Sequence, residues 1–584
     1  MRRLLALVAV CLLAPAALAG APPPGFAVAS AHPLATDAGI EVLQAGGNAF
    51  DAAVAVTAAL AVVEPYSSGI GGGGLWLLHR AADGRQTLVD GREKAPQAAS
   101  ATMYQDAQGH AIADLSRDGA IAGAIPGEPA ALDYMASRYG RLGLARDLAP
   151  AIRIAEQGFS LDERFARSLQ FEPQRLSPAA RALLMPAGKP LAQGDVLRQP
   201  DLAQTLRLLS QQGRRGFYEG EEARRLVDGV RAGGGIWTLQ DLAAYRVVER
   251  RPIVFHFRGN RIVTAPPPSA GGVGLAEILQ QLETRPWPGK DRLHADHEVI
   301  EAMRRAYRDR AAYLGDPDYV KMPLQRLLSP QYARALAAST LADQATASQS
   351  LPPPPADPAR SPHEGPETTH FSILDAQGNR VSATVTVNLI FGSGFMAPGT
   401  GVFVNDEMDD FAASLADSNA FGLVGSAANL VAPGKRPLSS MTPSFVEGPR
   451  GVLLVGTPGG SRIITMVTLG ILRFLGGADA RTIVAAPRFH MQYLPDRVEF
   501  EDGAFDSAEQ AGLAAMGYSL QRAGRPYGNM QAVVWNPLRN TLEAAADPRG
   551  VGTGRVVFAG QGAAAAHTQR PGSASARRRQ VQGR

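Results

Sequence analysis

The stretch ETTHFSIL (367–374) decides the fold, because the character of the sequence changes abruptly within it. Residues 339–367 hold a run of four prolines and three further prolines among serine, alanine and aspartate, which predicts a segment that cannot pack. Residues 370–374 and 380–388 are alternating apolar and polar runs separated by DAQGN (375–379). This pattern predicts a β-hairpin that begins directly after an unstructured arm.

Thr368 is the candidate nucleophile at this junction. A hydroxyl that attacks the carbonyl of Glu367 would cleave the chain and turn Thr368 into a new amino terminus. The freed α-amino group has an ordinary pKa of roughly 7.7–8.0, so it can accept the hydroxyl proton near neutral pH. These residues alone fit equally well with a surface linker that meets an ordinary strand.

Length and composition predict a globular, exported protein. The chain has 584 residues with 45% apolar content, enough for a large core. Residues 1–19 have the charged start, short apolar middle and small-residue end of a secretory signal, and no later run reaches the roughly 20 apolar residues of a membrane span. The expected location is therefore periplasmic or secreted. The single cysteine, Cys11, lies in this leader, which excludes disulfides and thiol chemistry from the mature chain.

The formal net charge of +4 comes from the two ends of the chain. Without the five arginines of the tail 561–584 and the two of the leader, it becomes −3. No nucleic-acid partner is expected, and the tail is interpreted as a disordered basic end.

The amino-terminal half predicts buried helices around a tight glycine segment. Residues 34–45 form an amphipathic pattern closed by two glycines, and 49–63 are almost entirely alanine and valine. GIGGGG (69–74) follows a helix and precedes a strand, the reverse of a dinucleotide-binding turn, so it is interpreted as backbone packed closely under a strand. Arg92 follows a predicted strand, where a surface role and a clamp for a substrate carboxylate are equally compatible with the sequence.

Polar and acidic residues gather in the second half. The strand that ends at Asn388 puts Ser382, Thr384 and Thr386 on the same face as Asn388, which suggests the wall of a site, although a solvated face would look the same. NDEMDDF (405–411) contains four carboxylates in five positions, an expensive concentration unless it holds a cation.

Two turns offer further binding groups. Ser439 and Ser440 place paired hydroxyls on a constrained turn, where helix capping is an equally good explanation. Gly459 and Gly460 lie between a strand and a buried helix, where backbone amides form a ready oxyanion hole. His294 and His297 have a spacing that suits a metal, but no accompanying carboxylate motif supports one, so neither a metal nor another cofactor is expected.

Together these residues resemble the γ-glutamyltransferase (γ-glutamyl transpeptidase) family of N-terminal-nucleophile hydrolases. The resemblance covers nearly the whole mature chain, through the following motifs: GGNAFDAAVA (46–55), SSGIGGGG (67–74), DGREKAP (90–96), GDPDYV (315–320), TTHFSI (368–373), NDEMDDF (405–411), GKRPLSSMTP (434–443), TPGGSRII (457–464) and APRFHMQYLPD (486–496).

The family implies an α+β fold, a four-layer αββα sandwich made by self-cleavage of one precursor. The two products, residues 20–367 and 368–560 with the tail 561–584, would stay together as a heterodimer. The implied reaction moves the γ-glutamyl group of glutathione or a related amide onto a threonine, and then to water, an amino acid or a dipeptide.

The resemblance also implies roles for individual residues. Cleavage would fall between Glu367 and Thr368. Thr368 looks like the nucleophile, Thr386 the hydroxyl that helps to activate it, and Gly459 and Gly460 the oxyanion amides. The substrate carboxylate would be held by Arg92, Ser439 and Ser440. The substrate ammonium would be held by Asn388, Glu407 and Asp410.

One residue departs from the family pattern, and two other functions stay open. A lid (415–426) is present, but Phe421 stands where many relatives have a tyrosine gate, which puts the closing hydrogen bond of the lid in doubt. A cephalosporin or glutaryl acylase of the same fold would accept a substrate without the α-amino group. A non-catalytic exported binding protein is the alternative from a different class.

Overall fold

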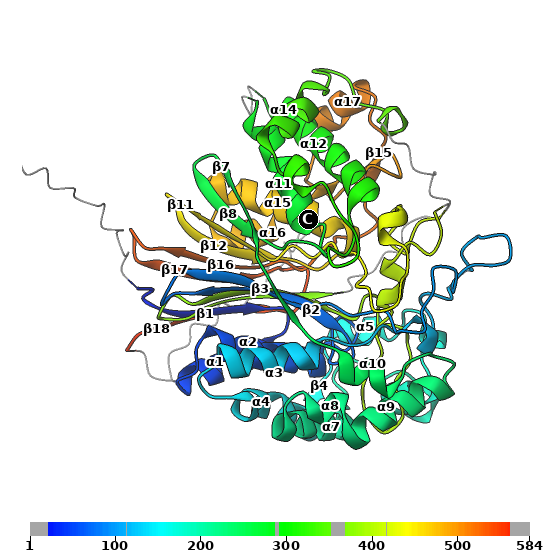
Figure 1. Cartoon of the computed structure of the whole chain (residues 1–584). Helices are drawn as coiled ribbons and strands as arrows, with labels where there is room; N and C mark the ends of the chain where they lie inside the picture. Colours follow the sequence, from blue (N-terminus) through cyan, green and yellow to red (C-terminus); the bar gives the residue numbers. More distant parts are fainter. Residues whose placement is uncertain (1–21, 113, 286–290, 352–367, 416, 561–584) are drawn as a thin grey trace, which may run out of the picture.

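The structure is a computed structural model that describes residues 22–112, 114–285, 291–351, 368–415 and 417–560. The predicted leader, Glu367 and the basic tail therefore lie outside the described residues. Two sheets lie face to face, and helices cover the outer face of each, which gives four layers in the order helix, sheet, sheet, helix (Figure 1). The predicted α+β sandwich is confirmed.

Both central sheets are antiparallel, and the hairpin after Thr368 lies in the middle of the first. In spatial order, the first sheet contains β18 (Thr553–Phe558), β1 (Gly25–Ser30), β9 (Thr369–Leu374), β10 (Arg380–Thr386), β2 (Gly73–Arg80), β3 (Arg85–Gly91) and β6 (Val248–Arg250). The second contains β17 (Thr541–Ala546), β16 (Gln531–Asn536), β12 (Gly451–Gly456), β11 (Ser444–Gly448), β8 (Asn260–Thr264) and β7 (Ile253–Phe257).

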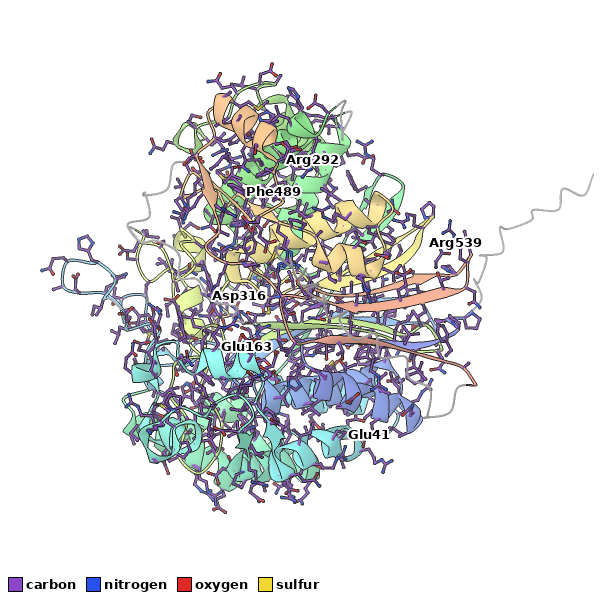
Figure 2. All side chains as sticks on the ribbon, turned by 180° about the vertical axis from the view of Figure 1, so that it is seen from behind. Glu41, Glu163, Arg292, Asp316, Phe489 and Arg539 are labelled. Atoms are coloured by element: carbon purple, nitrogen blue, oxygen red, sulfur yellow. The ribbon has the colours of Figure 1, made fainter. Side chains whose placement is uncertain are left out.

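Each helical layer packs its apolar faces on one sheet and forms a separate core with it. The first layer contains α1 (Pro33–Gln44), α2 (Ala49–Val63), α3 (Glu128–Arg138) and α4 (Leu144–Gln157). The second contains α11 (Gly271–Glu283), α12 (Arg292–Tyr313), α15 (Ile463–Leu475) and α16 (Ala480–Ala485). Figure 2 shows these layers from behind, with Glu41 of α1 below the sheets and Arg292 of α12 above them.

Shorter elements complete the two ends of the sandwich. Around the first layer these are β4 (Phe159–Ser160), α5 (Glu163–Ser168), α6 (Pro178–Leu184), β5 (Val196–Leu197), α7 (Pro200–Gln212), α8 (Arg215–Tyr218), α9 (Gly220–Ala232) and α10 (Leu239–Ala244). Around the second they are α13 (Leu324–Leu327), α14 (Pro330–Ala338), β13 (Phe489–His490), β14 (Val498–Phe500), α17 (Ser507–Ala515) and β15 (Leu520–Arg522). Within the described ranges, no helix is both long and apolar enough to span a membrane.

The predicted helix over residues 49–63 is confirmed, because α2 begins at Ala49 and ends at Val63. Asn48 caps α2 by accepting from the backbone N–H of Asp51, while the Asp51 carboxylate accepts from the N–H of Asn48. Every residue of α2 is buried, as its alanine and valine content predicts. The helix lies across β9 and β10, and so supports the strands that carry the candidate nucleophile.

The predicted hairpin is also confirmed. The Asp375 side chain organises its turn, because one carboxylate oxygen accepts the N–H groups of Gln377 and Asn379, both at 2.9 Å. The register pairs Thr369 with Val385. One step further along each strand, Thr368 therefore lies opposite Thr386.

Two expectations from the sequence need correction. Residues 339–351 do pack: the Ser348 hydroxyl is buried and donates to the Tyr493 carbonyl at 2.7 Å. Ser382 and Thr384 of β10 do not form a site wall, because they face the other sheet, where Ser382 donates to the Val455 carbonyl at 3.2 Å. Thr384 lies 2.9 Å from His370, and burial lowers the pKa of that imidazole to about 3, so it is neutral.

Candidate active site

The two threonines at the start of β9 and the end of β10 face each other at one edge of the space between the sheets. Their hydroxyl oxygens are 3.0 Å apart, and both residues are buried. The Thr386 hydroxyl accepts the backbone N–H of Asn388 at 2.8 Å. It is therefore free to donate its own proton to the Thr368 oxygen, which leaves the Thr368 proton available to a base.

The backbone holds Thr368 in an unfavourable conformation. Its φ is +92°, which is rare for a β-branched residue and costs about 1–3 kcal/mol. The N–H of Thr368 donates to the Ser67 carbonyl at 3.2 Å, and the Thr369 hydroxyl donates to Glu64 at 2.9 Å. Glu64 and Ser67, which lie just before the glycine run, thus help to hold Thr368 in its strained conformation.

That glycine run packs closely against the site, as predicted. A Cβ on Gly72 would lie 2.0 Å from the Thr386 carbonyl oxygen, and one on Gly71 would lie 1.9 Å from that of Phe403. Only glycine permits this approach of two backbones. The glycine run therefore lets its backbone pack against the end of β10 and the loop that follows β10.

The hydroxyl pair opens into a small cavity that gathers most of the predicted site residues. Gly459 does not line it, although its neighbour Gly460 does, and Glu367 lies outside the described residues. The predicted residues that line it are Arg92, Thr368, Thr386, Asn388, Glu407, Asp410, Phe421, Ser439, Ser440 and Gly460; Leu423, Met441 and Ile463 complete the wall.

The charged end of this cavity is centred on Arg92. Its Nη1 lies 2.7 Å from Glu407 and 3.5 Å from Glu93, and its Nη2 donates to Asp410. Burial alone would lower the pKa of the guanidinium, but the surrounding carboxylates raise it. Burial also raises the pKa of Glu407 well above its usual range and that of Glu93 to about 7.

Only two of the four carboxylates in NDEMDDF face the cavity. Asp406 accepts the backbone N–H of Leu389 at 2.9 Å and so supports the turn after β10. Asp409 accepts from the Ser116 hydroxyl and from the N–H of Ala420. The acidic run therefore does not act as one cation site in the cavity, because Asp406 and Asp409 do not line it, and Asp406 lies 3.8 Å from Arg175 instead.

The glycine turn and the lid meet at the wall of the cavity. Gly459 and Gly460 have φ values of +135° and +54° and lead into α15. The Phe421 ring is buried against this turn, since a Cβ on Gly460 would lie 2.4 Å from it. A side chain holds the lid backbone, because the Gln492 amide Nε2 donates to the carbonyls of Phe421 and Gly422 at 3.1 and 3.3 Å.

Three residues at or next to this site were not predicted from the sequence: Glu93, Gln492 and Arg310. Glu93 and Gln492 lie inside quoted motifs, so those motifs were a signal that could have identified them. Arg310 lies in a helix about 130 positions before the serine that it contacts, and nothing in its local sequence indicates that partner.

The histidine pair on α12 is divided between two environments. His294 is exposed beside Asp291 and Asp343, whereas His297 is buried against Tyr518 and the Leu341 carbonyl. The described part of the chain contains no group of three or more potential metal ligands.

A four-layer sandwich with a threonine at the head of a central strand is the architecture of the N-terminal-nucleophile hydrolases. Comparison with known proteins identifies one family within this class. The profile of the γ-glutamyltranspeptidase family matches residues 35–557. The chain belongs to the γ-glutamyltranspeptidase family.

Proteins named as glutathione hydrolases and proteins named as acylases are both similar to this chain. The glutathione hydrolase proenzymes of Pseudomonas sp. (strain A14) and Escherichia coli K12 are 43% and 38% identical to this chain; the alignments cover 90% of it, and 92% and 90% of those proteins. The acylase ACY 1 proenzyme of Pseudomonas sp. (strain V22) is 37% identical over 90% of this chain and 92% of its own.

Both kinds of protein also occur among the similar solved structures. The cephalosporin acylase from Bacillus halodurans superposes with a TM-score of 0.79 at 27% identity, over 94% of this chain and 99% of its own. A chain of Helicobacter pylori γ-glutamyltranspeptidase has a TM-score of 0.54 at 38% identity, over 56% of this chain and 94% of its own.

Proposed function

We propose that this protein is a self-processing γ-glutamyltransferase and hydrolase that acts on glutathione and related γ-glutamyl amides. The observation that carries the proposal is a single cavity with paired threonine hydroxyls at one end and a cluster of a guanidinium and carboxylates at the other. A zwitterionic amino-acid head group with an amide on its side chain fits both ends. The names of the most similar glutathione hydrolase proenzymes support this choice.

Self-cleavage comes first. The Thr368 hydroxyl attacks the Glu367 carbonyl, the peptide nitrogen leaves as the new α-amino group, and water hydrolyses the ester to free the Glu367 carboxylate and the Thr368 hydroxyl. The strained φ of Thr368 is defined by the carbonyl carbon of Glu367, so cleavage removes this torsion and its strain. The large subunit would comprise 20–367 and the small catalytic subunit 368–560, followed by the tail 561–584.

Turnover then uses the new terminus. The α-amino group of Thr368 accepts the hydroxyl proton, and the oxygen attacks the γ-carbonyl of the substrate. The N–H groups of Gly459 and Gly460 would stabilise the negative charge that develops on the carbonyl oxygen. The departing amine takes the proton, and the acyl group passes to water, an amino acid or a dipeptide. Threonine and its own amine supply nucleophile and base, so this chemistry needs no metal or organic cofactor.

Binding of the head group replaces ion pairs that the free pocket already contains. Arg92 donates to Asp410 and lies beside Glu407. A bound α-ammonium would take Glu407, Asp410 and the Asn388 side chain as partners, while the α-carboxylate would take Arg92, Ser439 and Ser440. Exchange of one set of opposite charges for another avoids leaving a buried charge unpaired.

The acylase function is the second candidate, favoured by the acylase relatives and by the Bacillus halodurans structure. A glutaryl substrate has no ammonium group that could pair with Asp410 and Glu407. Rates on γ-glutamyl and glutaryl anilides decide between the two functions. We expect faster γ-glutamyl release; faster glutaryl release would make the protein an acylase, and no turnover of either would make it a binding protein.

Cleavage is tested separately on a denaturing gel. The wild-type protein should give two bands, and the small one should begin Thr-Thr-His-Phe; any other start rejects Thr368 as the nucleophile. Thr368→Ala should remain a single unprocessed chain. The leader 1–19 predicts export, and cell fractionation tests it by locating the processed enzyme in the periplasm or medium.

A further inference from the structure

Arg310, on α12, is a buried cation directly behind the γ-glutamyl pocket. Helix α12 belongs to the helical layer above the second sheet (Figure 1), and Arg310 retains 6% exposure. Its Nη2 donates to the Ser440 hydroxyl at 3.3 Å, whereas its buried Nε has no hydrogen-bond partner. A guanidinium has five N–H donors, so this environment leaves Arg310 poorly satisfied.

No carboxylate among the described residues lies within ion-pair distance of Arg310. Burial lowers the pKa of Arg310. Tyr307 and Asp410 oppose this shift, but Asp410 is already paired with Arg92, whose own charge lowers the pKa of Arg310 further. A buried charge without a counter-ion is costly, and a fold retains one at a binding site when the ligand supplies the missing charge.

The contact between Arg310 and Ser440 also sets the direction of a hydroxyl. Because Ser440 accepts from Arg310, its proton is free to point elsewhere. Ser439 is arranged in the same way, since its oxygen accepts the backbone N–H of Met441 at 3.0 Å. Both serines line the cavity, so two hydroxyl donors stand side by side there with a positive charge behind one of them.

Two donors and a cation suit a carboxylate. A carboxylate accepts hydrogen bonds from both hydroxyls, and the nearby guanidinium favours its ionised form. The other side of the pocket has the opposite excess, because Arg92 is surrounded by Glu93, Glu407 and Asp410. A zwitterion whose carboxylate lies towards Arg310 and whose ammonium lies towards Glu407 would correct both imbalances.

We propose that Arg310 is a positioning residue for the α-carboxylate of the γ-glutamyl donor, acting through Ser440. It orients the Ser440 hydroxyl towards the carboxylate and supplies a second positive charge besides Arg92. This inference rests on the proposed function and adds to it a specificity determinant outside the cavity wall.

The test replaces Arg310 with glutamine and measures three anilides on the processed enzyme. γ-Glutamyl anilide has both charged groups, glutaryl anilide lacks the ammonium, and 4-aminobutyryl anilide lacks the carboxylate. For Arg310→Gln we expect KM for γ-glutamyl and glutaryl anilide to rise about tenfold or more, with kcat within threefold of wild type. The kcat/KM for 4-aminobutyryl anilide should not change. An unchanged KM for γ-glutamyl anilide, or a loss confined to kcat, would overturn the proposal, as would an equal loss on all three.

A double-mutant cycle with Ser440→Ala tests the route of the effect. If Arg310 acts through Ser440, the double variant should be little worse than Ser440→Ala alone; fully additive losses would contradict the route. Arg304→Gln is the matched control, because Arg304 is also a buried arginine of α12 but pairs with Glu301 and Asp496 away from the cavity. It should lower stability and leave the KM values unchanged.

Further measurements distinguish the effect of Arg310 on KM from a folding defect and from failure of the proposed function. Arg310→Lys keeps a charge at the position and should give an intermediate KM. Failure of both Arg310 variants to process would assign the residue to folding and overturn the proposal. If the wild-type enzyme turns over neither γ-glutamyl nor glutaryl anilide, the proposed function itself fails, independently of Arg310.

Discussion

Two buried ion clusters of this protein differ in how completely they are satisfied. The structural cluster comprises Arg488, Arg549, Glu501 and Asp547, near α16 and β14. The pocket cluster comprises Arg92, Glu93, Glu407 and Asp410. Each has four charged residues, but the first has two cations and two anions, whereas the second has one cation and three anions.

In the structural cluster, every carboxylate oxygen has two donors. The Glu501 oxygens accept from Arg549 at 2.9 and 2.6 Å and from the backbone N–H groups of Tyr527 and Arg488. The Asp547 oxygens accept from both arginines and from the N–H groups of Met530 and Arg549. Such a closed network has no place for a ligand.

The carboxylate oxygens of the pocket cluster have fewer hydrogen-bond donors. Glu407 lies 2.7 Å from Arg92, but neither of its oxygens makes a well-aligned hydrogen bond, and one oxygen of Glu93 is also unsatisfied. Unsatisfied buried polar groups cost free energy that a ligand can recover. Between these two clusters, the one that lines the cavity is therefore the one whose carboxylates a ligand could still satisfy.

Asp547→Asn should produce the largest effect on stability. The substitution leaves the buried Arg488 without its counter-ion, and breaking a buried pair costs about 3–5 kcal/mol. Urea unfolding of the single-chain Thr368→Ala precursor, with and without Asp547→Asn, measures this cost. The rate ratio between γ-glutamyl and glutaryl anilide, measured on the otherwise wild-type enzyme, should stay constant. A changed ratio would mean that the two clusters are coupled.

Glu93→Gln should change the pH dependence of stability by a smaller amount. Burial raises the pKa of Glu93 to about 7, above its unfolded value of roughly 4.3. Its contribution to stability is therefore fully present below pH 4.3 and is lost as the pH rises through 7. Between pH 5 and 8, the wild-type precursor should lose about 2–3 kcal/mol relative to Glu93→Gln. Unfolding midpoints of both at several pH values check this; parallel curves would show that Arg92 keeps Glu93 ionised.

Asp410→Asn tests the pocket as an ammonium site. The substrate would lose a charge-assisted partner worth about 1.5–3 kcal/mol, so kcat/KM for γ-glutamyl anilide should fall roughly 10- to 150-fold. Glutaryl anilide lacks the ammonium and should be affected much less, and processing should survive. Asp409→Asn is the comparison variant, because the neighbouring carboxylate contacts Ser116 and the lid residue Ala420 and does not line the cavity, so any loss that it causes should be the same for both substrates. Equal losses on both substrates would show that Asp410 is not an ammonium ligand.

The sequence predicts those parts of the molecule whose causes are local. Helix α2 follows from a run of alanine and valine behind an Asn48 cap, and the hairpin follows from the turn chemistry of Asp375 and Asn379. Residues 339–351 were misjudged because the partner of Ser348 is the carbonyl of Tyr493, far along the chain. Alternation likewise places Ser382 on a face of β10 without showing that a second sheet opposes it.

The candidate site was predictable where the motifs of the family name a residue type and position. The cavity gathers Arg92, Thr368 and Asp410 from segments widely separated in the sequence, and the resemblance had indicated each of them. Arg310 could not be predicted, because its significance comes from what is missing around it. The absence of a nearby carboxylate among the residues that the structure describes is a property of packing in three dimensions, which the helical pattern of residues 292–313 does not reveal.

The smallest expected effect concerns the lid over the pocket. Phe421 packs its ring on Gly460, and the backbone around it is held by Gln492. Phe421→Tyr adds a hydroxyl at a buried position, and a new hydrogen bond of about 0.5–1.5 kcal/mol would lower the open population of the lid by roughly two- to twelvefold. Water needs less room than a dipeptide, so a lid that opens readily favours hydrolysis. We therefore expect Phe421→Tyr to raise the ratio of transfer to hydrolysis, with glycylglycine as acceptor at fixed pH.

Gln492→Leu supplies the opposing variant for this prediction. It removes the two side-chain hydrogen bonds to the lid backbone and keeps similar bulk, so the lid should open more often and the transfer-to-hydrolysis ratio should fall. Opposite shifts in the two variants would show that lid closure controls the fate of the acyl-enzyme. A lower ratio in Gln492→Leu with no change in Phe421→Tyr would mean that the backbone contacts alone hold the lid. In that case the missing tyrosine hydroxyl has no consequence for partitioning, because Gln492 already performs the closing role that the hydroxyl was expected to serve.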